Sequence, residues 1–105
     1  MLATKTIKSR ELTQELRVLA DENRLKIIAC LSSGEKCVCQ LTDAVDIPQN
    51  LMSHHLKVLK KYGLVTDEHR GRWVYYTLKP NIVEDILAKI ELYCQSNTLD
   101  ITSHC

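Results

Sequence analysis

The sequence lacks several features that would assign it to a common class of protein. It has no apolar run approaching the about 20 residues that a membrane span needs, and its first stretch, MLATKTIKSR, has no hydrophobic signal-peptide core. It has no Gly-rich phosphate loop, no Ser/His/Asp order of a hydrolase and no Cys-x-x-Cys redox pair. These absences predict a cytoplasmic protein that has no membrane partner and is not an enzyme.

The chain also contains no internal repeat, low-complexity segment or linker. Its 105 residues suit one domain with a modest core and are few for an enzyme with a deep, lid-covered pocket. We therefore expect a single domain over residues 1–105, with a flexible N-terminal arm at about 1–8 and a C-terminal tail at about 96–105.

Charge is distributed unevenly, although the net charge is only +1. Residues 49–79 contain six Lys/Arg and two Asp/Glu, whereas the rest of the chain is net acidic. This window offers the cationic surface of the protein, and a polyanion such as double-stranded DNA is the partner that it favours.

Hydrophobic spacing predicts four helices, at about 9–19, 21–31, 37–45 and 49–62. In the second helix, Leu25, Ile28 and Leu31 are expected on one apolar side. The third and fourth helices are short and are separated only by the turn sequence DIP, which predicts a helix-turn-helix.

The hydrophobic period then changes from that of a helix to that of a strand. Residues 64–78 alternate between two faces, and Gly71 in HRGR supplies a turn, so we expect a β-hairpin. From Pro80 a last helix is predicted, with an apolar stripe formed by Ile82, Ile86, Ile90 and Tyr93 or Cys94. Four helices, a hairpin wing and a helix make a mainly α protein, a winged helix-turn-helix.

The fourth helix has two contrasting faces. Its predicted buried face is Met52, His55, Leu56 and Leu59. Because His55 falls among apolar residues, we interpret it as a core histidine. The other face carries hydrogen-bonding groups at its start and lysines toward its end, as a DNA recognition helix does. The expected DNA contacts from this helix are Gln49, Asn50, Ser53, His54 and Lys57, with Lys60 and Lys61 adding affinity without sequence information.

The hairpin tip supports this interpretation. Considered by itself, the fourth helix is explained equally well as a solvated surface helix. Arg70 and Arg72 flank Gly71 at a tip that is able to enter a minor groove or hold a phosphate, and this favours DNA binding.

At this point the sequence resembles the ArsR/SmtB family of metalloregulatory winged-helix repressors, and especially its arsenic-responsive members. The matching stretches are LADENRLKIIACL, GEKCVCQL, QNLMSHHLKVLKKYGLV and RGRWVYYTL, in this order. The resemblance implies a homodimer built on the first and last helices, a palindromic operator, and repression that is relieved when an inducer binds.

The resemblance also implies a role for Cys37 and Cys39, because a Cys-Val-Cys at the start of the third helix is the family's thiolate site for As(III) or Sb(III). A similar pair serves in Cd(II)/Pb(II) sensors. The sequence departs from the arsenic pattern at Thr42, where a third cysteine is usual, and from the Cd(II)/Pb(II) pattern in having no cysteine in its N-terminal arm.

The chemistry of the pair leaves the remaining ligand open. As(III) needs a third sulfur, and Cd(II), Pb(II) or Zn(II) needs three or four soft donors. We favour Cys105, beside His104 in the tail, over Cys94 and Cys30, whose expected role is packing; a small thiol or a water is a further alternative. The last helix has no histidine before His104, which argues against a Zn(II) site there.

The position of the pair suggests a mechanism. Residues i and i+2 of a regular helix point about 200° apart, so chelation of one ion by Cys37 and Cys39 would unwind the first turn and move the recognition helix. Two other functions stay open: a thiol redox switch on the same scaffold, and a metal carrier, although a carrier has no need for a basic helix and an arginine-tipped hairpin.

Overall fold

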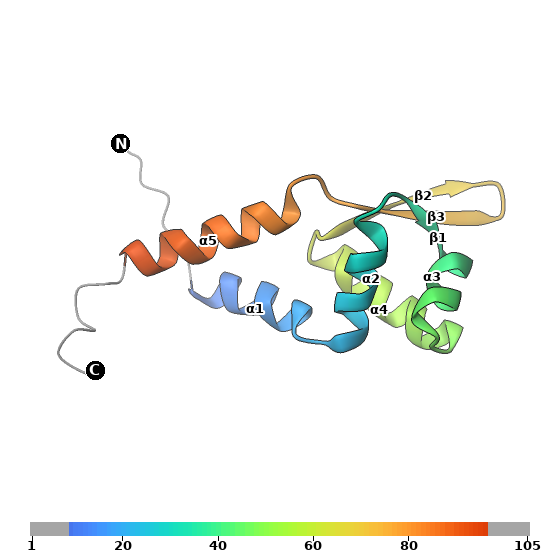
Figure 1. Cartoon of the computed structure of the whole chain (residues 1–105), viewed down its shortest axis with the longest axis horizontal. Coiled ribbons are helices and arrows are strands. Elements are labelled where there is room, and N and C mark those ends of the chain that lie inside the picture. The colour runs from blue at the N-terminus through green and yellow to red at the C-terminus, as the bar shows by residue number, and fades with distance from the viewer. Residues whose placement is uncertain (1–8, 97–105) are drawn as a thin grey trace. The chain divides into compact units, whose positions relative to one another are not determined.

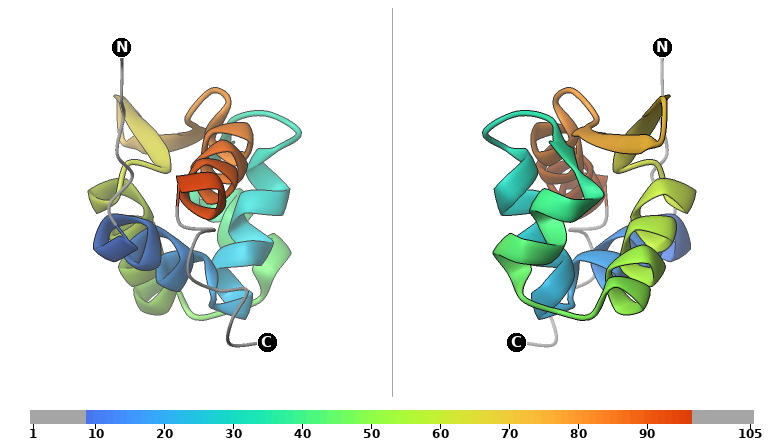
Figure 2. Two further views of the ribbon diagram at one scale, coloured as in Figure 1. Left: turned by 90° about the vertical axis from the view of Figure 1, so that its left-hand side faces the viewer. Right: turned by 90° about the vertical axis from the view of Figure 1, so that its right-hand side faces the viewer.

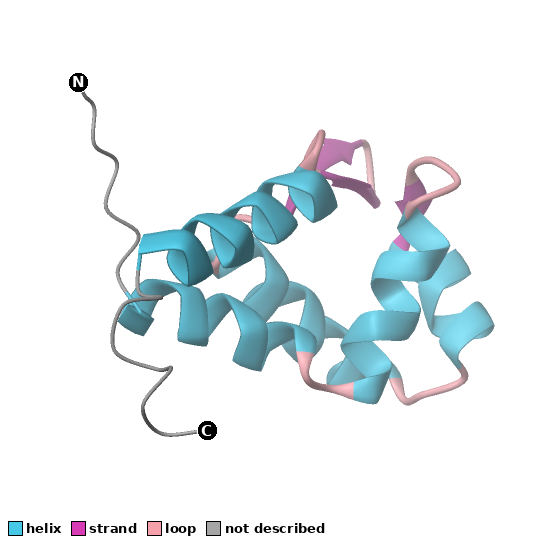
Figure 3. Cartoon of the chain, turned by 60° about the vertical axis from the view of Figure 1, so that its left-hand side comes forward, coloured by secondary structure: helices cyan, strands magenta, loops and turns pink. Residues whose placement is uncertain are grey.

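The computed structural model describes residues 9–96, which form five helices and three short strands (Figure 1). Coloured by secondary structure, this part of the chain is mainly helical with one small sheet (Figure 3). The predicted winged helix-turn-helix is confirmed. The elements are α1 (Ser9–Leu19), α2 (Glu22–Leu31), β1 (Lys36–Cys37), α3 (Val38–Val45), α4 (Gln49–Lys61), β2 (Val65–Arg70), β3 (Trp73–Leu78) and α5 (Ile82–Ser96).

The described residues divide into two compact units. The larger, residues 17–80, contains α2, the helix-turn-helix and the sheet. The smaller consists of residues 9–16 and 81–96, the first part of α1 together with α5. Within the smaller unit the Nζ of Lys89 pairs with the carboxylate of Glu15 at 3.0 Å, which ties α5 to α1.

The core of the larger unit is built where α2, α3, α4 and the hairpin meet. Its most deeply buried side chains are Ile27, Leu41, Met52, Leu56, Leu59, Leu64 and Val65. The expected face of α2 is partly wrong, because Leu25 is 53% exposed whereas Ile27 is fully buried beside the correctly placed Leu31. The sequence ENRLKIIACL has apolar residues in two helical phases, and packing against α3 and α4 selects the phase of Ile27 and Leu31.

Two tight turns, one before and one after α4, set the position of this helix. Asp46, with φ of 61°, ends α3, and its N–H donates to the carbonyl of Thr42 at 2.9 Å. Gly63, with φ of 77°, follows α4 in the left-handed region that favours glycine. The predicted turn at 46–48 is therefore confirmed, and α3 packs directly against α4.

The strands form an antiparallel sheet in the order β1-β3-β2. Gly71, with φ of 62°, and Arg72 make a two-residue turn between the paired residues Arg70 and Trp73. In the views from either end, the hairpin is drawn in yellow and orange and α4 in yellow-green (Figure 2), and β2 packs against α4. The structure thus confirms the predicted wing.

Strand β1 was not expected. The third helix was predicted to start at Cys37, but Cys37 is extended and pairs with Tyr75 of β3, so α3 begins at Val38. A two-residue strand gives no alternating pattern to read, and only the exposed edge of β3 makes this pairing available.

Candidate nucleic-acid interface and cysteine pair

Helix α4 presents the two faces that its sequence predicts. The four predicted core residues Met52, His55, Leu56 and Leu59 are buried. All the predicted DNA contacts of this helix are exposed: Gln49, Asn50, Ser53, His54 and Lys57. The helix therefore offers hydrogen-bonding side chains at its start and lysines farther along, an arrangement suited to the major groove.

Buried His55 anchors α4 to the start of α2. Its side chain accepts a hydrogen bond at Nδ1 from the guanidinium of Arg24 at 3.3 Å, and its Nε2 lies 4.0 Å from Asp21. Asp21 also caps α2 by accepting from the N–H of Arg24 at 3.1 Å. Since the Arg24 guanidinium only donates, Nδ1 must be unprotonated, and the imidazole is neutral in this arrangement. The interpretation of His55 as a core histidine is confirmed.

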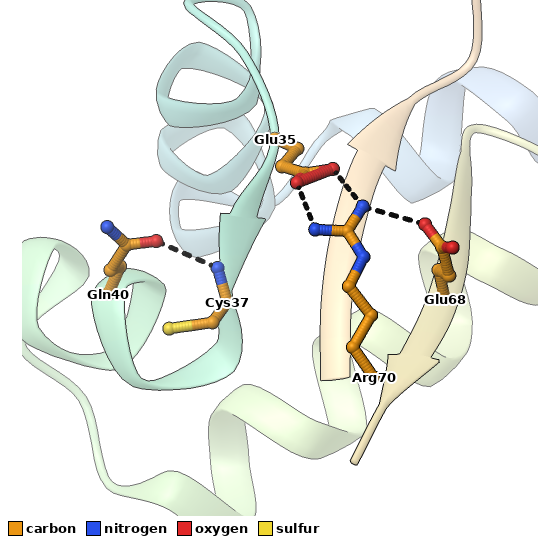
Figure 4. A network of polar contacts seen from close by, with 5 residues as sticks. All are labelled: Glu35, Cys37, Gln40, Glu68 and Arg70. Carbon is orange, nitrogen blue, oxygen red and sulfur yellow. Dashed lines mark hydrogen bonds and ion pairs between the residues drawn. The ribbon is translucent and has the colours of Figure 1, made fainter. Parts of the chain in front are cut away.

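The two arginines of the hairpin are in different situations. Arg70 donates to both carboxylate oxygens of Glu35, at 2.6 and 2.9 Å, and to Glu68 at 2.7 Å (Figure 4). Its guanidinium also lies 4.5 Å from the centre of the Tyr75 ring. The hydrogen bonds from Arg70 lower the pKa of Glu35 below its usual value. Arg70 thus joins the wing to the segment that precedes the cysteine pair.

Arg72, at the turn itself, is exposed, and no acidic side chain within residues 9–96 pairs with it. The lysines of α4 also differ in whether an acidic side chain already pairs with them. The Nζ of Lys60 lies 3.0 Å from a carboxylate oxygen of Asp67 on β2. Arg72 and Lys57 therefore keep their charge free for an anion, whereas Arg70 and Lys60 have acidic partners.

Cys37 and Cys39 meet at the junction of β1 and α3. Their Cα atoms are 5.4 Å apart, within the range of a disulfide, and the structure pairs their sulfur atoms as one. Cys37 is 7% exposed, and its N–H donates to the side-chain oxygen of Gln40 at 2.9 Å (Figure 4). Cys39 lies in the first turn of α3 and is exposed.

The prediction that chelation by Cys37 and Cys39 would unwind the first turn of α3 is wrong. Cys37 has φ of −79° and ψ of 163°, so it lies outside the helix, and only Cys39 follows helical geometry. The two sulfur atoms reach each other while α3 stays intact. A ligand that bridges them has no need to unwind the first turn.

A groove of about 530 Å³ opens beside the cysteine pair. Helix α3 contributes Cys39 and Thr42 to its lining, α4 contributes Gln49 and Ser53, and the hairpin contributes Arg72 and Trp73. The groove therefore brings one cysteine next to three of the residues predicted to contact DNA.

Comparison with known proteins identifies the scaffold. Residues 21–67 match the model of the arsR family of bacterial regulatory proteins. The arsenical resistance operon repressor of Bacillus subtilis (strain 168) is 39% identical over 92 residues, which are 87% of this chain and 87% of that protein. The chain belongs to the arsR family. It is a DNA-binding transcriptional regulator, and its resemblance to this family is confirmed.

A second relative and a solved structure agree with this assignment in sequence and in fold. The arsenical resistance operon repressor of Escherichia coli (strain K12) is 47% identical over 70 residues, 66% of this chain, and the match spans 60% of that protein's length. HlyU from Vibrio cholerae N16961 has a TM-score of 0.68 and 31% identity, with 82% of this chain and 95% of that chain covered. By name, the relatives from E. coli and B. subtilis are repressors of an arsenical resistance operon, a non-enzymatic role.

Some predicted features of this arsR-family chain are not placed by the structure. Cys105 and His104, and the predicted arm and tail, lie outside the described residues. Of the other two cysteines, Cys30 is half-buried and Cys94 is exposed on α5. Within residues 9–96 no cluster of three or more His, Cys, Asp or Glu side chains is arranged to hold a metal ion, and no helix is long and apolar enough to cross a membrane.

Two features of the site were missed in the sequence. The sequence pattern places Trp73 on the hairpin and indicates no function for it, yet Trp73 lines the groove and is 51% exposed. The sequence marks Thr42 only as the position of a missing cysteine, yet Thr42 lines the same groove. A tryptophan two residues after the turn glycine is the signal that was available, because tryptophan combines a large apolar surface with a polar N–H and is enriched at interfaces.

Proposed function

We propose that this chain represses transcription as a homodimer on a palindromic operator, and that it is released when As(III) or Sb(III) binds Cys37 and Cys39. The observation that carries the proposal is the meeting of the two sulfur atoms at the edge of a groove lined by α4 and the wing. An ion on this pair lies next to the surface that would contact DNA.

The cysteine segment is joined to both parts of that surface. Cys37 pairs with Tyr75 of β3, and α3 packs against α4. Glu35, two residues before Cys37, holds Arg70 of the hairpin. A structural change at the cysteine pair would therefore act through direct contacts on both the recognition helix and the wing. Couplings between two sites are typically about 1–3 kcal/mol, or about 5–150-fold in affinity, which is sufficient to open a promoter.

The proposed DNA contacts are those of α4, namely Gln49, Asn50, Ser53, His54 and Lys57, together with the hairpin arginines Arg70 and Arg72. Between the two arginines, we assign the direct contact to Arg72. Arg70 first has to exchange Glu35 and Glu68 for a phosphate.

The smaller unit supports dimer formation. Four large apolar side chains are exposed on it: Leu16, Val83, Leu87 and Leu92. Together they leave an apolar surface on α1 and α5 that a second copy of the chain would cover. A dimer places two recognition helices on two half-sites, as a palindrome requires.

The first experiment measures operator release by fluorescence anisotropy. The wild type and a Cys37→Ser/Cys39→Ser variant are titrated with arsenite and, separately, with Cd(II), Pb(II) and Zn(II). We expect arsenite to release the wild type and to leave the double variant bound. Equal responses of the two proteins, or no response of either, would contradict the assignment of the pair. A Cys105→Ser variant tests the proposed third ligand, because loss of that sulfur should weaken the arsenite response.

A thiol redox switch is the second candidate, and the pairing of the two sulfur atoms in the structure favours it. Oxidation of the dithiol would then take the place of metal binding. This function predicts that peroxide releases the protein after thorough metal removal and that a reductant restores binding. Release by arsenite under reducing conditions would instead favour the metalloid sensor.

A further inference from the structure

The side chain of Glu35 joins the segment before the cysteine pair to the wing. Glu35 immediately precedes β1, and both of its carboxylate oxygens accept from the Arg70 guanidinium, at 2.6 and 2.9 Å. Glu35 and Glu68 lie on opposite sides of this guanidinium (Figure 4). Two parallel hydrogen bonds fix the orientation of the two groups as well as their separation. The contact therefore sets the position of the end of β2 relative to the start of β1.

The backbone pairing between β1 and β3 is short. It consists of Lys36 opposite Tyr76 and Cys37 opposite Tyr75, whereas β2 and β3 pair over six residues each. A pairing of two residues has few backbone hydrogen bonds, so β1 should shift against β3 more readily than β2 does. The ion pair with Arg70 is consequently a substantial part of what holds the wing to the cysteine segment.

A movement of Cys37 would reach the Arg70 guanidinium from two sides. Glu35 lies two residues before Cys37, and extended backbone advances about 3.3 Å per residue, so the chain between them has little slack. The backbone of Tyr75 pairs with Cys37, and the Tyr75 ring lies 4.5 Å from the Arg70 guanidinium. A shift of the Cys37 backbone would therefore displace both supports of this guanidinium, the carboxylate and the ring.

Arg70 is adjacent to the part of the wing whose charge is free for DNA. It is the last residue of β2 and pairs with Trp73 across the turn formed by Gly71 and Arg72. Arg72 is exposed and only two residues away. A change in the orientation of Arg70 would therefore move Arg72 relative to α4.

We propose that Glu35 is a positioning residue of the repressor, and that its contact with Arg70 transmits inducer binding at Cys37 and Cys39 to the wing. The inference rests on the proposed function and specifies how its inducer site is coupled to DNA binding. Because α3 stays intact while the two sulfur atoms meet, the main route runs along β1. An inducer on the pair shifts β1 and weakens the contact of Glu35 with Arg70, and the wing loses the position that the operator requires.

The contact can be removed without unfolding the protein, and the wing itself offers a matched control. The side chains of Arg70 and Glu35 are 44% and 37% exposed, and ion pairs as exposed as this contribute little to stability. Glu68 is a second carboxylate partner of Arg70, at 2.7 Å, but it lies on β2 within the wing. Glu35→Ala and Glu68→Ala each remove one negative charge, so their long-range effects on DNA attraction should be alike. Only Glu35→Ala also removes the link to β1.

The test measures the operator affinity of the full chain by fluorescence anisotropy, with and without saturating arsenite, in a phosphine reductant that keeps the cysteines as thiols. The factor by which arsenite weakens the affinity is the coupling between the two sites. We expect a factor of about 5–150 for the wild type, a factor at least about fivefold smaller for Glu35→Ala, and the wild-type factor for Glu68→Ala.

Three further measurements separate transmission from a purely structural role. Without arsenite, Glu35→Ala and Glu68→Ala should bind the operator equally well. The ultraviolet absorbance of the arsenic–thiolate bonds should show that Glu35→Ala binds arsenite as the wild type does. Arg70→Ala should lose the coupling as Glu35→Ala does, and the Glu35→Ala/Arg70→Ala double variant should lose no more, because both changes remove the same contact.

The outcomes distinguish this inference from the function on which it rests. Full coupling in Glu35→Ala, or an equal loss of coupling in Glu68→Ala, would overturn the inference and leave the repressor function intact. Weaker operator binding by Glu35→Ala than by Glu68→Ala without arsenite, or a loss of arsenite binding in Glu35→Ala, would also overturn it, because Glu35 would then support the wing or the cysteine site itself. Failure of arsenite to release the wild type would overturn both the inference and the proposed function.

Discussion

At the scale of single residues, His55 has the most constrained environment. It is 5% exposed and lies on the recognition helix, yet it contacts Arg24 and Asp21 at the start of α2. Burial lowers the pKa of His55; Asp21 opposes this effect, while Arg24 and the neighbouring His54 add to it. Protonation of His55 would place a positive charge against the Arg24 guanidinium and remove the acceptor at Nδ1.

This environment predicts that the protein loses stability in mild acid. The unfolded chain binds a proton at His55 at higher pH than the folded chain does, so the free energy of unfolding should fall as pH drops through about 6.5, the ordinary histidine value. Denaturant unfolding at several pH values from about 8 to about 5 measures how steeply the free energy of unfolding depends on pH.

A His55→Gln variant provides the control for this prediction. Glutamine keeps a hydrogen-bonding side chain but does not titrate, so the slope in this window should become smaller even if the variant is less stable overall. Asp21, whose pKa is lowered chiefly by its hydrogen bond from the N–H of Arg24, contributes only in stronger acid. An unchanged slope in His55→Gln would show that other groups cause the acid sensitivity.

At the scale of elements, the wing combines two different arginines. Arg70 is held by Glu35 and Glu68 and stacks on Tyr75, whereas Arg72 is exposed at the turn. Arg70 therefore positions the wing relative to β1, and Arg72 supplies the charge for DNA.

These roles predict different effects on DNA binding. Each phosphate contact contributes a slope of about one to the dependence of log affinity on log salt, so Arg72→Ala should lower that slope by about one per subunit. Arg70→Ala should leave the slope nearly unchanged. Anisotropy titrations at several salt concentrations measure both variants; an equal loss of slope in Arg70→Ala would mean that Arg70 also leaves its acidic partners to bind a phosphate.

At the scale of the whole molecule, the proposed operator binding depends on the dimer. The apolar surface of the smaller unit includes Leu87, which is 60% exposed. A charge placed within an apolar interface would be buried without a partner, a costly arrangement.

Leu87→Asp should therefore convert the dimer to a monomer and greatly weaken operator binding, while the helical content stays unchanged. Sedimentation velocity, circular dichroism and anisotropy measure the three properties. Leu25→Asp is a matched control, since Leu25 is similarly exposed but lies in the larger unit. A Leu87→Asp protein that sediments as a dimer would place the subunit interface elsewhere.

The amino-acid sequence by itself determined the order of the main elements and the faces of the recognition helix. The buried side chains of α4 follow a single helical phase, namely Met52, His55, Leu56 and Leu59. A glycine also follows each of α4 and β2, so local spacing was sufficient to predict where these elements lie and which face of α4 is buried. Family membership could also be read from four short motifs, and the comparisons confirm it.

Tertiary structure alone decided the details on which the mechanism depends. Packing between helices buries Ile27 and leaves Leu25 exposed. Pairing with the edge of β3 places Cys37 in a strand instead of the helix, so chelation by Cys37 and Cys39 no longer requires the first turn of α3 to unwind. The groove unites residues of α3, α4 and the hairpin that are distant in sequence. Local spacing describes one element at a time, whereas a strand pairing or a groove depends on the free energy of contacts between elements.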